Sequence, residues 1–176
     1  MQLVAECLSC GKGLTLNRIY IVGNGASLKE VNLDLLIGKD TMAVNKIHLL
    51  YGETKWRPTY YMKMDFSAFD TGDWKEELLL HVNGGEQCLF WEAFRAGAQE
   101  GDGNRDFIFD GIGDFPNVRY VERCDDHYMR TAQWHPLCTG LNSIVTMVLW
   151  ALELGYDEIV LVGCDGMFGD PKEDHF

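Results

Sequence analysis

Glycine, amide and carboxylate residues follow the apolar runs of this chain, at the points where predicted strands end. In a parallel sheet these strand ends share one edge, and ligands bind beyond that edge. Glycines let a ligand approach the backbone, amides both donate and accept hydrogen bonds, and carboxylates bind Mg²⁺ or sugar hydroxyls. The pattern therefore predicts one polar site at the sheet edge. Its residues are Gly23, Asn24, Gly25, Asn45, Asp65, Gly163, Cys164 and Asp165.

The stretch IYIVGNGASLKE at 19–30 predicts a strand, a tight turn and then a helix. Two glycines one residue apart before a helix N-terminus are typical of a phosphate site. Ser27 and Glu30 form an S-x-x-E capping box, and the Ser27 hydroxyl either caps the helix or contacts a phosphate. A dinucleotide fingerprint has a third glycine where this chain has Leu28, and an acid where it has Asn45. The motif thus favours a mononucleotide over NAD or FAD, with a plain tight turn as the alternative.

Five residues after strands or before a helix could take part in the chemistry. Thr139 and Gly140 precede a predicted helix, and they either bind a ligand or simply cap that helix. Asp65 and Asp165 end their strands, where they hold Mg²⁺, orient sugar hydroxyls or cap loops. His175 follows the last strand in DPKEDHF and is a candidate general base, with an exposed tail histidine as the alternative.

Composition limits the class of protein. A length of 176 residues, 47% hydrophobic and 12% aromatic, predicts one globular domain with a core. The net charge of −12 argues against a general nucleic-acid or anionic-membrane binder, because both need a basic face. No run approaches the roughly 18 to 20 apolar residues of a transmembrane segment. The expected partner is a nucleotide or nucleotide-sugar, and a homo-oligomer remains open.

The six cysteines predict ordinary thiols and not a metal centre. Cys7 and Cys10 form a C-x-x-C, but a structural zinc site needs a second close pair and the sequence has none. Reduced thiols are typical of the cytoplasm, where we expect this protein to lie.

Strands alternating with helices predict an α/β, Rossmann-like, mainly parallel sheet with helices on both faces in a single domain. The domain spans 18–176, after an N-terminal arm at 1–17. A helix is expected at 73–82, while 86–94 is either strand or helix. A long helix presents one apolar face, made of Leu141, Ile144, Val145, Val148, Leu149 and Leu152, and it ends at Gly155. Strands are predicted at 19–22, 41–46, 58–65, 117–123 and 158–165, the last of them of the fully buried type.

The order of these motifs resembles that of the bacterial lipooligosaccharide sialyltransferases, which depend on CMP-sialic acid. The similar segments are IYIVGNGASLKEVNLDLL, AVNKI and TGLNSIVTMVLWALELGYDEIVLVGCDGM. The segments WRPTYYMKMD and DHF resemble the related 6-hydroxymethylpterin diphosphokinase-like group. Together these segments lie within 19–65 and 136–176, about half of the chain.

The resemblance implies a glycosyltransferase with a CMP-sugar as co-substrate and no tightly bound cofactor. It implies that His175 is the base and that Asp65 stands where that family has an amide. The family continues beyond the position of Phe176, which implies either a natural minimal version of the fold or a C-terminally truncated domain. The alternatives are a Mg²⁺-dependent diphosphokinase-like enzyme, with Asp65 and Asp165 as ligands, and a non-enzymatic nucleotide-binding module. The residues implied to line the nucleotide are Gly23, Asn24, Gly25, Ser27, Asn45, Thr139 and Gly140.

Overall fold

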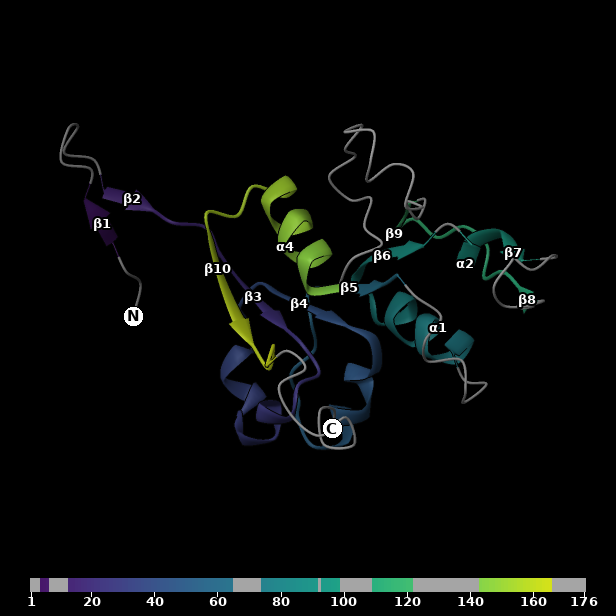
Figure 1. Cartoon of the computed structure of the whole chain (residues 1–176), viewed down its shortest axis with the longest axis horizontal. Coiled ribbons are helices and arrows are strands. Elements are labelled where there is room, and N and C mark those ends of the chain that lie inside the picture. The colour runs from purple at the N-terminus through teal and green to yellow at the C-terminus, as the bar shows by residue number, and fades with distance from the viewer. Residues whose placement is uncertain are drawn as a thin grey trace.

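A six-stranded, entirely parallel sheet forms the centre of the computed structural model (Figure 1). The structure describes residues 4–6, 13–64, 74–91, 93–98, 109–121 and 143–165. The strands lie side by side in the order β10-β3-β4-β5-β6-β9, which confirms the predicted Rossmann-like α/β class. They are β3 (Arg18–Val22), β4 (Thr41–Val44), β5 (Tyr60–Lys63), β6 (Gln87–Trp91), β9 (Val118–Val121) and β10 (Glu158–Val162).

Helices cover both faces of the sheet, as predicted. The helix α4 (Ser143–Glu153) packs on one face, and α1 (Trp74–Gly84) packs on the other together with the 3-10 helices (Figure 1). No helix in the described ranges is long and apolar enough to cross a membrane. The shorter elements are η1 (Ala26–Glu30), η2 (Leu33–Leu36), η3 (Asn45–Gly52), α2 (Ala93–Ala96), the antiparallel pair β1 (Val4–Glu6) and β2 (Gly13–Thr15), and the antiparallel pair β7 (Gly97–Ala98) and β8 (Phe109–Asp110).

The segment 86–94, which sequence periodicity left as either strand or helix, contains a strand. Residues 87–91 form the strand β6, which pairs with β5 on one side and β9 on the other. Cys88, Leu89 and Phe90 are buried because each face of this inner strand packs against a layer of the core. A strand buried on both faces has no alternation of apolar and polar residues, which explains why its sequence was ambiguous.

The buried face of α4 differs from the predicted one. Met147 and Trp150 are fully or almost fully buried against the sheet, whereas Val145 and Leu152 of the predicted apolar face are exposed. The helix is apolar almost all round, so its pattern does not define a single inward face. Its predicted end is confirmed, because Gly155 adopts a left-handed conformation (φ 84°) and donates its N–H to the Leu152 carbonyl.

The strand β10 lies at the edge of the sheet, although its continuous apolar sequence predicted a buried strand. Among the described residues it pairs with β3 alone, and Leu161 is 52% exposed. Arg18 of β3 and Glu158 of β10 form a two-pronged ion pair, with N···O distances of 2.7 and 2.9 Å. This pair and the parallel ladder fix β10 against β3 and place the ends of the two strands together.

Candidate functional site

The ends of β3 and β10 form the point at which the strand order reverses. After β3 the chain adds β4, β5, β6 and β9 on one side of it, and it then returns to place β10 on the other. In open parallel sheets the crevice at such a reversal is the usual ligand site. The segment Gly23–Gly25 follows β3, and Gly163–Asp165 follows β10, so both predicted loops meet at this point.

The glycines of these two loops allow the loops to contact each other. Gly23 donates its N–H to the Val162 carbonyl, and Gly25 donates to the Gly163 carbonyl, both at 2.8 Å. A Cβ atom on Gly23 would overlap the Gly163 carbonyl oxygen, and one on Gly25 would overlap the Asp165 carboxylate. The sequence interpreted these glycines as room for a ligand, whereas in the structure the neighbouring loop takes that room.

Leu28, at the position of the missing third glycine, packs against the β10 loop. Its side chain is buried, and its Cβ and Cδ1 would lie 3.0 Å from a Cβ atom placed on Gly163. Gly163 has a positive φ of 61°, which glycine adopts without strain. In a dinucleotide fold the third glycine lets the helix pack closely against the strand. Here Leu28 takes that position, and Gly163, which follows β10, allows the close packing instead.

The predicted capping box is wrong. The element after Gly25 is the five-residue 3-10 helix η1. Its N-cap residue is Gly25, which has no side chain to cap the helix, and not Ser27. Ser27 instead donates both its backbone N–H (2.8 Å) and its hydroxyl to the carboxylate of Asp165. These two bonds lower the pKa of Asp165, hydroxyl bond first. A carboxylate therefore occupies the place expected for phosphate, and a phosphate there would have to displace it.

Two asparagines extend the site toward β4. Asn24 donates its side-chain amide to the Val44 carbonyl at 3.1 Å, which ties the β3 loop to the end of β4. Asn45 follows directly and has a left-handed backbone (φ 51°), the only non-glycine residue with positive φ in the described part of the chain. Its Oδ1 atom is buried, and no described residue donates a hydrogen bond to it. An orphan acceptor of this kind needs a donor, such as a ribose hydroxyl or a base amino group.

The structure thus brings Gly23, Asn24, Gly25, Ser27 and Asp165 together, with Asn45 one strand away at the end of β4. The remaining predicted residues are Asp65, Thr139, Gly140 and His175, which lie outside the described residues. Cys164 packs between the loops, and burial raises the pKa of its thiol. No group of three metal-binding side chains occurs within the described ranges.

A buried polar network, which the sequence reasoning missed, lies beside Asn45 between β5 and α1. The Tyr61 hydroxyl donates to the Asn45 carbonyl oxygen (3.0 Å) and to the Glu77 carboxylate. Lys63 Nζ lies 3.1 Å from the same carboxylate oxygen, and the Lys63 side chain is fully buried. Burial and the nearby Glu77 raise the pKa of Tyr61, which keeps the hydroxyl protonated.

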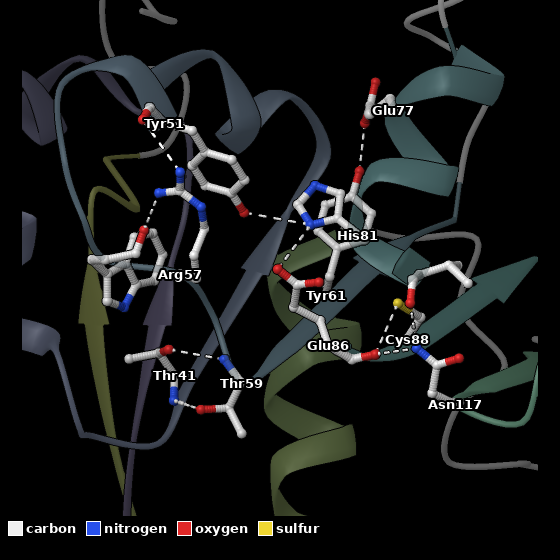
Figure 2. A network of polar contacts seen from close by, with 12 residues as sticks. Thr41, Tyr51, Arg57, Thr59, Tyr61, Glu77, His81, Glu86, Cys88 and Asn117 are labelled. Carbon is white, nitrogen blue, oxygen red and sulfur yellow. Dashed lines mark hydrogen bonds and ion pairs between the residues drawn. The ribbon is translucent and has the colours of Figure 1, made fainter. Parts of the chain in front are cut away.

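His81 of α1 stacks on the Tyr61 ring, and the two residues lie together in Figure 2. The two rings are stacked, with centroids 3.4 Å apart and planes 8° apart. His81 Nδ1 lies 3.4 Å from the Tyr51 hydroxyl and 3.8 Å from Glu86 Oε1. His48 lies next to this network, and burial lowers its pKa, so it is mostly neutral at pH 7. The sequence contained one signal for this network. Lys63 lies two residues after Tyr61, and residues two apart in a strand share one face, so a buried Tyr61 places Lys63 on the same buried face.

Comparison with known proteins gives no relative for this chain. No protein-family profile, no curated protein and no solved structure matches it. The site is therefore interpreted from its own geometry.

Proposed function

We propose that the protein is a nucleotide-binding transferase, and that it acts as a glycosyltransferase with a CMP-sugar donor. The observation that carries this proposal is the buried Oδ1 of Asn45 beside the strand-order reversal, to which no described residue donates a hydrogen bond. An amide acceptor there suits the donor groups of a ribose or a cytosine ring. The resemblance of the GNG, AVNK and GYDEIVLVGCD segments to the sialyltransferases supports cytidine as the nucleoside.

The reaction we propose needs binding, orientation and one proton transfer. An acceptor hydroxyl attacks the anomeric carbon of the sugar while the bond from that carbon to the phosphate oxygen breaks. The electron pair leaves with the phosphate, which yields CMP, and the hydroxyl proton passes to a base. We assign this base to His175 by resemblance. The carboxylate of Asp165 repels a phosphate at Ser27, so the nucleoside end of the donor lies nearer to Asn45.

A second candidate function rests on Asp165. Its carboxylate is exposed at the strand-order reversal and its lowered pKa keeps it ionised. An ionised carboxylate at this edge also suits Mg²⁺ carrying a nucleoside triphosphate, as a diphosphokinase-like reaction requires.

Calorimetric titration of CMP, CTP and ATP, with and without Mg²⁺, separates these functions. Cytidine binding that does not depend on Mg²⁺ supports the glycosyltransferase, and ATP binding that requires Mg²⁺ supports the second candidate. Absence of all binding overturns both. A positive cytidine result should be followed by measuring release of CMP from CMP-sialic acid, which His175→Ala should slow while leaving CMP affinity unchanged.

A matched pair of variants tests the site itself. Asn45→Ala removes the orphan acceptor and should weaken CMP binding roughly 3- to 10-fold, the equivalent of one hydrogen bond. Asn83→Ala removes an exposed amide from the last turn of α1 and should leave the affinity unchanged. Equal CMP affinity in Asn45→Ala and wild type would show that the site has been placed wrongly.

A further inference from the structure

The conformation of Asn45 depends on a contact from the core. A non-glycine residue in the left-handed region persists only where its surroundings hold it there. Asn45 joins β4 to η3 in this conformation, and its carbonyl oxygen accepts the hydroxyl of Tyr61 at 3.0 Å. This bond fixes the peptide group after Asn45. A change of the Asn45 backbone would rotate that group away from Tyr61 and would turn the Asn45 side chain with it.

Tyr61 is itself held by two residues of α1. Its ring is stacked on His81 and its hydroxyl also reaches the Glu77 carboxylate, and Lys63 contacts the same oxygen of that carboxylate. A tyrosine hydroxyl has a single proton, so Asn45 and Glu77 share it as two acceptors. Because Lys63 compensates the charge of Glu77, the carboxylate competes less strongly with the Asn45 carbonyl for the hydrogen bond from Tyr61.

We propose that Tyr61 is a positioning residue for the ligand site, acting through Asn45, and that Glu77, Lys63 and His81 hold it in place. The inference rests on the proposed function, in which Asn45 contacts the nucleoside. It assigns to the α1 side of the sheet a role in nucleotide affinity, although none of its side chains needs to touch the ligand. The affinity of the site is then set partly by a bond in the core.

Tyr61→Phe and Tyr60→Phe form a matched test on neighbouring residues of β5. Tyr60 points to the α4 side, where its hydroxyl lies 3.3 Å from that of Tyr156. Both variants lose one hydroxyl from a partly or fully buried ring. We expect Tyr61→Phe to weaken CMP binding roughly 3- to 10-fold and Tyr60→Phe to change it less than about twofold, as loss of one positioning bond predicts. Equal affinities for the two variants would overturn the inference.

A double-variant cycle distinguishes positioning from general destabilisation. If Tyr61 acts through Asn45, Tyr61→Phe should change CMP affinity less than about twofold in an Asn45→Ala background. Additive losses in the double variant would overturn the inference. A measurement without ligand tests the same inference when CMP affinity is too low to compare the variants. Amide hydrogen exchange in η3 should be faster in Tyr61→Phe than in Tyr60→Phe, and equal exchange would count against the inference.

The outcomes separate this inference from the proposed function. If wild type binds no nucleotide, both fall together. If wild type binds CMP and Asn45→Ala weakens it, while Tyr61→Phe binds as wild type does, the proposed function stands and only the positioning role is overturned.

Discussion

Replacing Glu77 by glutamine should destabilise the protein far more than the same change at the surface. Lys63 is fully buried and the side chain of Glu77 is 6% exposed, so neither charge has water to compensate it. Removing one partner of a buried pair leaves the other charge unpaired, which costs about 3–5 kcal/mol. Glutamine keeps the shape and one oxygen acceptor for Lys63 and Tyr61, so we expect the lower end, about 3 kcal/mol.

The matched control is the ion pair between Arg119 and Glu153, which is close (2.6 Å) but lies at the surface, with side chains 45% and 34% exposed. Glu153→Gln should cost only about 0–1 kcal/mol, because water replaces the lost partner. The two variants thus compare the same chemical change at the same kind of contact in two environments.

Equilibrium unfolding in urea measures both effects, with the fluorescence of the buried Trp56 and Trp150 as the signal. Glu77→Gln should lower the transition midpoint without changing its slope. The double variant Lys63→Met/Glu77→Leu removes both charges and should recover most of the lost stability, to within about 1 kcal/mol of wild type. Equal costs for Glu77→Gln and Glu153→Gln would refute the reasoning, since burial would then contribute nothing.

Two further predictions concern the loops. Gly25→Ala places a Cβ atom against the Asp165 carboxylate and should lower the melting temperature, whereas Gly52→Ala meets nothing within 4 Å and should leave it unchanged. The pKa of Asp34 is lowered, first by the Thr54 hydroxyl, and this favours the ionised form in the folded state. The resulting stability is present above the unfolded pKa, about 3.9, and is lost as pH falls through the lower folded value. Thr54→Val should therefore shift the Asp34 titration, followed by carboxyl NMR, to higher pH.

Local patterns were sufficient to predict the sheet and the meeting point of its loops. Each apolar run that ends in glycine or amide, such as 19–22 and 41–44, is a strand of the parallel sheet. Sheet geometry then brings Gly25 and Asp165 together, because parallel strands end at one edge. Such predictions succeed where the deciding interactions are the burial of a short segment and the direction of the strand.

Predictions failed where a distant residue decides a local conformation. Ser27 has an acid three residues on, at Glu30, but the carboxylate that it contacts is 138 residues away in sequence, at Asp165. The network of Tyr61 and Glu77 was missed for a similar reason. Glutamate on a short helix normally faces water, and only the tertiary fold shows that this one faces the core. The roles of residues outside the described ranges, His175 among them, stay predictions.

The position of β10 at the sheet edge has a consequence for handling the protein. A short apolar strand with free backbone groups on its outer side is a template onto which another strand can add, and proteins commonly protect such edges with charge. Glu158, the one charged residue of β10, is already neutralised by Arg18, and in the described part of the chain no strand pairs with the outer side of β10. We therefore expect the repulsion between molecules of net charge −12 to protect this edge. That repulsion vanishes near the isoelectric point of about 4.7. Colloidal stability should therefore fall steeply as pH approaches this value, and Leu161→Glu, which adds a negative charge to the exposed edge strand and lowers the isoelectric point, should extend the soluble range to lower pH.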